Sequence, residues 1–338
     1  MAKLFLGLGS GLFLIKKIGG ISYLLIVKDL AWVLGWSVLI LILLGVIGGI
    51  IGGWLMARGK NISLLKIKKK DRVLFIAPHP DDAVLAAGGL LNHLFKEKIP
   101  LQITYLTCGD GNVSLFWRDK QIKFSPQKFI ATGKERGQDA IKAIKTLGGK
   151  EKNLIFLGYP DSGLQAMQLR PKEVISSPTT KLTHCPYSFT FKKNSEYQEK
   201  NVVADLILIL KRFRPTIIFL PHLKDSNADH RATTHFLQKA VAKINWSGKT
   251  YQYLIHYQWF RIFRLYPWPQ KTPGKETILF PPSPLWKKGS WFSFWLRPKQ
   301  LKKKRKALEA YRSQFPLPNI KSFFASFLTQ NELFEKMS

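Results

Sequence analysis

A run of 27 residues, 30–56, contains no charged side chain and constrains this chain more than any other feature. As an α-helix with a rise of ~1.5 Å per residue, the run would be about 40 Å long, which exceeds the ~30 Å hydrocarbon core of a bilayer. Trp32, Trp36 and Trp54 lie near its ends, where amphipathic rings occupy the headgroup level. We therefore predict a transmembrane helix over residues 30–57. The alternative, a buried core helix of a soluble protein, is rarely this long and this apolar.

Basic residues are distributed unevenly around this run. Lys16, Lys17 and Lys28 lie close before it, whereas seven basic residues follow it between positions 58 and 72. This bias predicts a single-pass membrane protein whose chain after residue 58 faces the cytoplasm. The segment 1–29 holds apolar stretches that are too short to span a bilayer, so we expect it to be interfacial. A cleavable signal peptide is the alternative for that segment, and it would leave the anchor in place.

Glycines in the uncharged run repeat every fourth residue, at Gly45, Gly49 and Gly53 and at Gly48 and Gly52. A helix face made of glycine lets another helix approach closely. The repeat would therefore allow a homodimer through this face.

Apolar β-rich runs alternate with segments of helical spacing after a basic juxtamembrane linker at 58–70. The expected strands are 73–77, 101–107, 154–157 and 216–220, and the expected helices are 82–95, 129–147, 202–213 and 232–244. This alternation predicts an α/β fold with a mostly parallel sheet and helices on both of its faces. We assign it to a domain at 71–315, followed by a C-terminal tail at 316–338.

The net charge of +32 predicts attraction to polyanions, either an anionic membrane surface or nucleic acid. Tryptophans and cations are interspersed from 251 to 295, and the run 302–306 is entirely basic. Because a membrane helix is already predicted, anionic membrane lipids are the economical partner and nucleic acid is disfavoured; a solvated basic face is the third interpretation. The two cysteines, Cys108 and Cys185, lack the spacing of a disulfide framework, which favours a reducing compartment.

Two polar clusters directly follow predicted strands. His79, Asp81 and Asp82 follow the first strand, and a segment ending in Asp229 and His230 follows the fourth. Ligands bind outside the carboxyl ends of strands in such sheets, so the two clusters should share one crevice. One histidine and one carboxylate three residues apart, with a second histidine from a distant loop, form a three-ligand zinc site that leaves a position open for water. We therefore predict His79, Asp82 and His230 as metal ligands.

Asp81 is the predicted catalytic base, which takes a proton as metal-bound water attacks a carbonyl carbon. The alternative makes Asp81 and Asp82 helix N-cap residues, because carboxylates at a helix start satisfy unpaired amides. The neighbouring His79 and the second cluster around His230 favour the metal site.

The sequence resembles the PIG-L/LmbE-like N-acetylglucosaminyl deacetylase family. The resemblance begins with the run from His79 to Asp82 and the following Val84–Gly89. Further matching motifs are Thr107–Gly111, Arg136 with Asp139, Leu147–Gly148, Leu157–Leu164, Asp229–Arg231 and the segment 306–314. The resemblance therefore covers about residues 71–315.

This resemblance implies a Rossmann-like fold and hydrolysis of the N-acetyl group from an N-acetyl amino sugar or its glycoconjugate. It assigns Zn²⁺, or another divalent metal such as Fe²⁺, to His79, Asp82 and His230, and the role of general base to Asp81. It also implies that Arg136 and Asp161 contact the substrate. The alternatives are an exposed helix cation for Arg136 and a turn residue for Asp161.

Two positions depart from the family pattern, because Ala83 replaces a glutamate and Asn227 replaces a histidine. The family's histidine stabilises the oxyanion or protonates the leaving amine, whereas an asparagine donates a hydrogen bond but delivers no proton. We place Asn227 among the substrate-binding residues and name His222 and His184 as candidate acids. We expect Asp229 to orient His230 from outside the metal's ligands.

The sequence thus predicts a membrane-bound, metal-dependent N-deacetylase. A catalytically weakened metal-binding member that serves as a sugar-binding or membrane scaffold protein is the alternative, because the proton donor is missing at Asn227. A basic scaffold that recruits nucleic acid is a third hypothesis.

Overall fold

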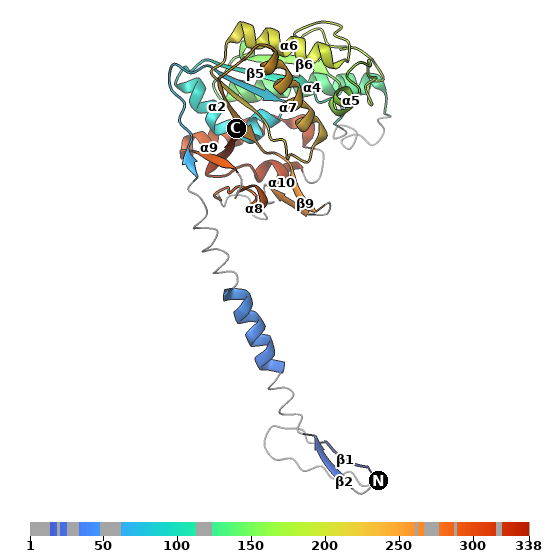
Figure 1. The fold of residues 1–338 in the computed structure, drawn as a ribbon, viewed down its shortest axis with the longest axis vertical. Coiled ribbons are helices and arrows are strands. Elements are labelled where there is room, and N and C mark those ends of the chain that lie inside the picture. The colour runs from blue at the N-terminus through green and yellow to red at the C-terminus, as the bar shows by residue number, and fades with distance from the viewer. Residues whose placement is uncertain are drawn as a thin grey trace. The chain divides into compact units, whose positions relative to one another are not determined.

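The computed structural model describes residues 14–18, 21–25, 34–47, 62–112, 124–260, 263–266, 277–286, 289–315 and 320–337. The chain divides into two units, Met1–Asn61 and Ile62–Ser338 (Figure 1).

The first unit contains an antiparallel hairpin and a helix. The hairpin pairs β1 (Leu14–Ile18) with β2 (Ile21–Leu25) inside the expected interfacial segment. The helix covers 34–47, within the uncharged run, and its side chains are exposed. Within the residues that the structure describes, no helix combines the length and the apolar character that crossing a membrane requires. The remainder of the expected span, 30–33 and 48–57, lies outside those residues, so the transmembrane helix and its glycine face stay predictions.

The second unit is built on an eight-stranded sheet in the order β3-β11-β12-β8-β7-β4-β5-β6. The strands are β3 (Ser63–Leu64), β4 (Val73–Ala77), β5 (Leu101–Thr107), β6 (Leu154–Tyr159), β7 (Ile217–Pro221), β8 (Lys249–Tyr253), β11 (Ser290–Trp295) and β12 (Asn331–Lys336). Strands β4 to β8 are parallel, whereas β12 runs antiparallel to both β8 and β11. The predicted α/β fold with a mostly parallel sheet is confirmed.

The order of the five parallel strands creates a crevice. Strands β4, β5 and β6 follow one another outward in one direction, and the chain then crosses to the other side of β4 to form β7 and β8. The loops after β4 and β7 therefore diverge at the point where the strand order reverses, and an open α/β sheet binds its ligands at that point. Both predicted polar clusters lie on these two loops and on the first turns of the helices that follow them.

Helices pack against this sheet in two groups. One group contains α2 (Asp82–Lys96), α4 (Pro126–Thr146) and α9 (Pro298–Leu308), and the other contains α5 (Leu164–Leu169), α6 (Glu199–Phe213) and α7 (Ala228–Lys243). Right-handed crossovers on either side of the reversal place the two groups on opposite faces. The remaining described elements are two short helices, α8 (Ser283–Trp286) and α10 (Ile320–Ala325), two 3₁₀ turns at Glu151–Asn153 and Arg312–Gln314, and the hairpin of β9 (Tyr257–Phe260) and β10 (Phe263–Tyr266).

The core is centred on β4, whose five residues are all buried. Phe75 stacks against Phe219 of β7 at a centroid distance of 5.7 Å and against Tyr253 of β8 at 4.9 Å. Aromatic pairs across neighbouring strands stabilise a sheet beyond the burial of their area. This packing fixes the loop after β4 relative to β7.

The segment that we expected to be a C-terminal tail, 316–338, instead supplies β12 to the middle of the sheet. Its sequence Asn331–Lys336 carries three charges in six residues, so it lacks the continuous apolar pattern of a buried strand. The structure satisfies one of these charges internally, because Glu332 is 1% exposed and paired with Lys304.

Glu332 also accepts hydrogen bonds from backbone amides at a break in α2. Ala87 has non-helical backbone angles (φ −142°, ψ 20°) within that helix. The backbone amides of Gly89 and Leu90 donate to the two carboxylate oxygens of Glu332, each at 2.8 Å. The ammonium group of Lys304, which is as buried as its partner, donates to Glu332 at 2.8 Å. The kink therefore brings α2, α9 and β12 together through one buried carboxylate.

We predict that Glu332→Gln lowers the free energy of unfolding by about 3 kcal/mol, because it leaves the Lys304 ammonium buried without a counter-charge. The double variant Glu332→Gln/Lys304→Met should recover part of that loss, since it removes the buried charge and keeps the apolar stem. Denaturant unfolding of the full chain, followed by circular dichroism, measures both values. A single variant as stable as the wild type would show that this ion pair does not hold α2 to β12.

Candidate metal centre

The first cluster occupies the turn between β4 and α2. Asp81 stands at the N-cap position of α2, but its side chain makes no capping hydrogen bond. Asp82 begins the helix, and its Oδ2 accepts a hydrogen bond from the backbone amide of His79 at 2.9 Å. The hydroxyl of Tyr311 donates to the carbonyl oxygen of Pro80 at 2.9 Å, so the turn is anchored from the chain segment after α9. The capping alternative therefore does not explain Asp81.

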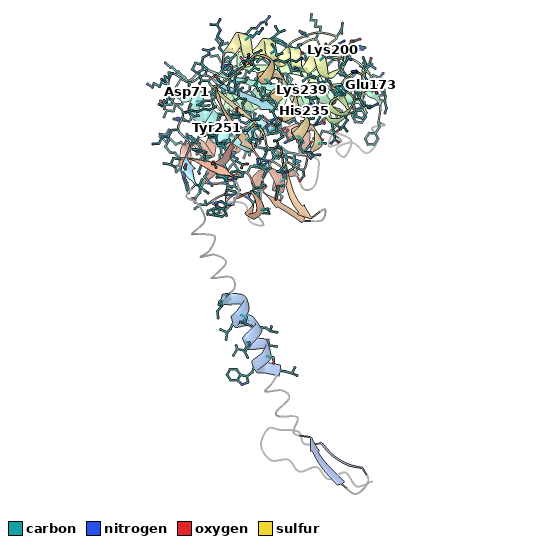
Figure 2. All side chains as sticks on the ribbon, viewed as in Figure 1. Asp71, Glu173, Lys200, His235, Lys239 and Tyr251 are labelled. Carbon is teal, nitrogen blue, oxygen red and sulfur yellow. The ribbon has the colours of Figure 1, made fainter. Side chains whose placement is uncertain are left out.

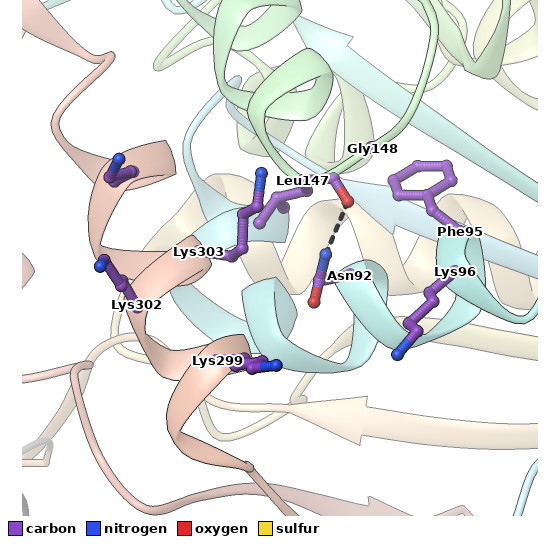
Figure 3. Close-up of a pocket in the computed structure, with 9 residues that line it drawn as sticks. Asn92, Phe95, Lys96, Leu147, Gly148, Lys299, Lys302 and Lys303 are labelled. Atoms are coloured by element: carbon purple, nitrogen blue, oxygen red, sulfur yellow. Dashed lines mark hydrogen bonds between the residues drawn. The ribbon is translucent and has the colours of Figure 1, made fainter.

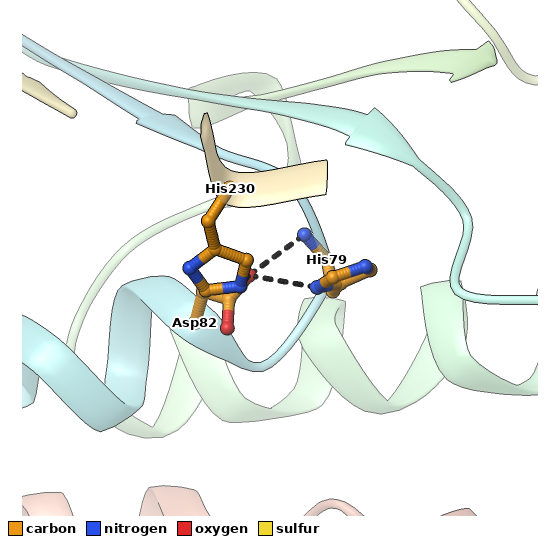
Figure 4. Close-up of side chains that lie close together, drawn as sticks. All are labelled: His79, Asp82 and His230. Atoms are coloured by element: carbon orange, nitrogen blue, oxygen red, sulfur yellow. Dashed lines mark hydrogen bonds and ion pairs between the residues drawn. The ribbon is translucent and has the colours of Figure 1, made fainter. Parts of the chain in front are cut away.

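Two imidazoles that are far apart in the sequence meet at one carboxylate oxygen (Figure 4). Oδ2 of Asp82 lies 3.1 Å from Nδ1 of His79 and 3.3 Å from Nε2 of His230. His230 comes from the first turn of α7, and the two rings have a centroid distance of 5.3 Å. His230 is completely buried, and Asp82 is 2% exposed. The three side chains predicted as metal ligands therefore come together.

The charges in this cluster are strongly coupled. Burial by itself lowers the pKa of His79, but the charges of Asp161 and Asp82 outweigh burial and hold that pKa well above 6.5. Burial acts in the same way on His230, and Asp225 with Asp82 raises its pKa to about 10. The pKa of Asp82 is held well below its ordinary value by the two imidazoles, although burial opposes this shift. The carboxylates around the two imidazoles therefore stabilise positive charge at this point.

The donor atoms fit a divalent metal ion. Nitrogen or oxygen atoms of His79, Asp82 and His230 lie within 4.8 Å of one another, and neither ring nitrogen of buried His230 makes a hydrogen bond of normal geometry. Two imidazole nitrogens and one carboxylate oxygen are the donor set of catalytic zinc sites.

A second group of equal compactness contains His79, Asp161 and Asp229. It offers one imidazole and two carboxylates, whereas the first group offers two imidazoles and one carboxylate. Carboxylates of both groups accept backbone hydrogen bonds, Asp161 from Gly111 and Asp82 from His79, each at 2.9 Å, so the number of imidazoles separates the two groups. The first group is therefore the better metal site.

Asp81 lies beside the centre with both carboxylate oxygens engaged. Arg136 of α4 donates from Nη2 to Oδ1 at 2.9 Å, and Gln314 donates from Nε2 to Oδ2 at 3.0 Å. The other terminal nitrogen of Arg136 donates to the carbonyl oxygen of Gly109 at 2.8 Å. Gly109 has φ +71°, and a Cβ there would approach the guanidinium to 2.3 Å, so glycine is required at this position. Sequence reasoning gave Gln314 no role, although it lies in the last matching motif.

Arg136 and Asp161, which we predicted as substrate contacts, both reach the centre. Arg136 is 4% exposed and clamps Asp81 rather than standing as an exposed helix cation. Oδ1 of Asp161 lies 3.3 Å from Nε2 of His79, on the ring edge opposite Asp82. Burial alone raises the pKa of Asp161, but the charges of His79 and Arg136 lower it to about 2.

The carboxylate that faces His230 from outside the cluster is Asp225, whereas we had expected Asp229. Oδ2 of Asp225 lies 3.2 Å from Nδ1 of His230. The same oxygen accepts hydrogen bonds from the backbone amides of Ile255 and His256, each at 3.0 Å. Oδ2 of Asp229 lies 3.7 Å from Nε2 of His79. The prediction relied on the adjacency of Asp229 and His230 in the sequence. Successive side chains of a helix point in different directions, so Asp229 faces His79, while Asp225 in the loop before α7 faces His230.

The candidate acids His222 and His184 make their contacts elsewhere. His222 hydrogen-bonds with Glu335 through Nε2, accepts the amide of Lys224 at Nδ1 and stacks on Trp291. His184 forms an isolated β-bridge with Glu196. Asn227 caps α7, since its side-chain oxygen accepts the amide of Asp229 at 2.8 Å. The ring of His256 instead lies beside His230, which it meets edge-on at a centroid distance of 5.2 Å, slightly less than the 5.3 Å between His79 and His230.

A further buried carboxylate, Asp110, borders the centre. Its Oδ2 accepts a hydrogen bond from the hydroxyl of Tyr187 at 2.9 Å. Burial and the charge of Asp161 raise the pKa of Asp110 to about 7. Asp110 therefore keeps its proton in the folded protein at pH values where the unfolded chain has released it.

We predict that this proton makes wild-type stability fall as the pH rises from about 4 to about 7, because the folded state then binds a proton that the unfolded state lacks. Asp110→Asn removes the titration and mimics the protonated acid. Its free energy of unfolding should match that of the wild type near pH 4 and exceed it by at least about 1 kcal/mol above pH 7. Thermal unfolding with a chelator present measures the difference, and an equal difference at both pH values would contradict the raised pKa.

A family model described as PIG-L, GlcNAc-PI de-N-acetylase, matches residues 74–241. The match contains the three candidate ligands as well as Asp81 and Arg136. A search of curated protein sequences found no match.

Solved structures resemble the chain at low sequence identity. The N,N'-diacetylchitobiose deacetylase from Pyrococcus horikoshii is 19% identical with a TM-score of 0.48, covering 79% of this chain and 84% of that one. A deacetylase triple mutant from the teicoplanin biosynthetic pathway is 15% identical with a TM-score of 0.49, covering 78% and 97%. The 4-carboxy-2-hydroxymuconate hydratase from Pseudomonas putida is 13% identical with a TM-score of 0.48, covering 79% and 96%.

All three TM-scores lie below 0.5, and the three proteins are named for two different reactions, so these similarities carry no argument about activity. The assignment depends on the family match and on the cluster of buried histidines and carboxylates within it. Through residues 74–241, the chain belongs to the PIG-L family.

Proposed function

We propose that this protein is a metal-dependent N-deacetylase, which removes the acetyl group from an N-acetylglucosamine-type glycoconjugate at a membrane surface. The observation that carries the proposal is the convergence of two imidazoles and one carboxylate oxygen beside a second carboxylate, Asp81, that is not a member of the metal-binding group. Membership of the PIG-L family supports the same chemistry.

His79, Asp82 and His230 would hold the metal, for which Zn²⁺ fits the two nitrogens and one oxygen best. A divalent metal bound there supplies Lewis-acid chemistry, which polarises a carbonyl and lowers the pKa of water. Asp161 and Asp225 face the outer nitrogens of His79 and His230 at 3.3 and 3.2 Å, and such carboxylates fix the ring orientation of a ligand histidine.

Asp81 moves the protons in this mechanism. Arg136 and Gln314 fix its carboxylate with one hydrogen bond to each oxygen, and each oxygen keeps a further lone pair for a water proton. Asp81 accepts one proton as the water oxygen bonds to the acetyl carbon. When the carbon–nitrogen bond breaks, Asp81 returns that proton to the amine nitrogen, so a free amine and acetic acid leave. The second proton of the water departs with the acetic acid, which ionises to acetate in solution. This route requires no acid at Asn227, whose side chain caps α7.

Arg136, Asp161 and Asn227 contact the amino sugar in this proposal, since Arg136 and Asp161 lie beside Asp81 and His79, and Asn227 caps the helix that carries His230. The uncharged run 30–56 anchors the chain as a single span, and the excess of basic residues after it places the domain on the cytoplasmic side. The membrane-bound substrate would then be a glycoconjugate carried by a lipid.

We predict that Asp81→Asn lowers kcat for acetate release by at least about 100-fold, because an amide cannot take the proton of water. The bound metal should stay at one ion per chain, since Asp81 lies outside the metal-binding group. The assay uses the full chain in detergent with N-acetylglucosamine and lipid-linked N-acetylglucosamine substrates, and elemental analysis counts the metal.

Glu173→Gln is the matched control, because Glu173 is an exposed carboxylate on the surface of the domain (Figure 2). It should leave acetate release unchanged. If Asp81→Asn releases acetate at the wild-type rate, Asp81 is not the base. If the wild type binds metal yet hydrolyses no member of the panel, the protein is a sugar-binding scaffold and not an enzyme. Asn227, which replaces the family's histidine, favours this second candidate.

A further inference from the structure

A second concave site lies beside the end of α2. It has a volume of about 400 Å³ and lies between the last turn of α2, the exposed face of α9 and the turn after α4 (Figure 3). Phe95 and Leu147 form its apolar floor. Five lysines complete the lining, and we call them the lysine pocket: Lys96, Lys299, Lys302, Lys303 and Lys306.

The spacing of the lysines in α9 builds this pocket. The four lysines from 299 to 306 stand at helix positions i, i+3, i+4 and i+7, which share one face. Lys304 belongs to the opposite face, where Glu332 buries and neutralises it at 2.8 Å. That ion pair fixes the rotation of α9, so its remaining lysines stay directed outward.

Contacts between helices hold the pocket open in advance of any ligand. The side chain of Asn92 donates to the carbonyl oxygen of Leu147 at 2.9 Å and pins the end of α4 to α2 (Figure 3). Gly149 follows closely against the Phe95 ring, and a Cβ at Gly149 would approach that ring to 2.5 Å. The floor is therefore rigid, whereas the lysines above it are exposed and free to adjust.

The positive charge of the pocket is not balanced locally. All five lysines are exposed, and within the described part of the chain none has a carboxylate oxygen within 4.0 Å. Lys96 and Lys299 point toward each other from opposite sides (Figure 3). Like charges repel, so an anion between them would stabilise the arrangement.

This site is separate from the metal centre. The centre lies at the first residue of α2, Asp82, and the pocket at its last turn, which contains Asn92 and Lys96. Fourteen residues of helix at ~1.5 Å per residue put about 20 Å between the two. The pocket therefore does not bind the reacting acetyl group.

We propose that the lysine pocket binds the phosphate headgroup of an anionic phospholipid. Lysine ammonium groups attract phosphate as compact point charges, and several of them beside a membrane favour an anionic surface. The apolar floor at Phe95 and Leu147 offers a surface for the glycerol and the first methylenes of a lipid, which free phosphate would leave unused. The net charge of +32 and the uncharged run at 30–56 favour a lipid over a soluble anion.

Binding of short-chain phosphatidylglycerol to the full chain in neutral detergent, measured by thermophoresis, tests the proposal. We expect binding at least tenfold tighter than that of short-chain phosphatidylcholine, which has the same apolar part. Lys299→Glu/Lys303→Glu should weaken phosphatidylglycerol binding at least tenfold. Lys200→Glu/Lys211→Glu is the matched control, because it makes the same charge change at exposed lysines of α6 and should alter binding less than threefold.

The acetate release of Lys299→Glu/Lys303→Glu should equal that of the wild type, so loss of lipid binding and loss of the proposed hydrolysis are distinguishable. Equal binding by the two double variants, or equal binding of the two lipids, would overturn the proposal. Inorganic phosphate that binds as tightly as phosphatidylglycerol would make the pocket a site for free phosphate. A single-stranded oligonucleotide that binds more tightly, with the same dependence on Lys299 and Lys303, would replace the lipid by nucleic acid.

Discussion

The crevice depends on the electrostatic balance between buried imidazoles and the carboxylates around them. Asp82 lies between His79 and His230, while Asp161 and Asp225 face the outer nitrogens of the same rings. Burial opposes every one of these charges, so each persists only because an opposite charge lies within hydrogen-bonding distance. The pKa values of both imidazoles are raised, so bound protons supply the positive charge between the carboxylates. A divalent cation at the same point would supply that charge in place of the protons. The same balance explains why so many polar groups stay buried beside a hydrophobic sheet.

Helix α2 connects this centre with the rest of the domain. Its first turn carries Asp82, and its kink at Ala87 frees two amides that Glu332 accepts. Its last turn borders the lysine pocket. Lys304 contributes both to the kink and to the lysine pocket. Its ion pair with Glu332 stabilises the kink, and it also fixes the rotation of α9 that directs the other lysines outward. One helix therefore connects the crevice of histidines and carboxylates with the face that carries the lysine pocket.

The sequence predicted the parts of this fold that depend on local pattern. Strand β4 was expected at 73–77 and is observed there, because a β-rich apolar run bounded by polar residues has few other solutions. The convergence of His79, Asp82 and His230 could also be predicted, since residues after parallel strands meet at one edge of the sheet. Strand β12 could not be predicted in this way, because its buried Glu332 depends on Lys304, which is distant in the sequence. Gln314 was missed for the same reason, because it is distant in the sequence from Asp81, to which it donates. Asp225 is close to His230 in the sequence, but no local pattern shows that its side chain, and not that of Asp229, faces the outer nitrogen of His230.

X-ray absorption at the zinc edge of the loaded full chain tests the central claim most directly. Coordination by His79, Asp82 and His230 predicts nitrogen and oxygen neighbours at about 2.0–2.2 Å with the outer scattering of two imidazoles, and one imidazole fewer in His230→Ala. A sulfur neighbour at about 2.3 Å, or an unchanged spectrum in His230→Ala, would contradict the claim that these two loops hold one metal ion.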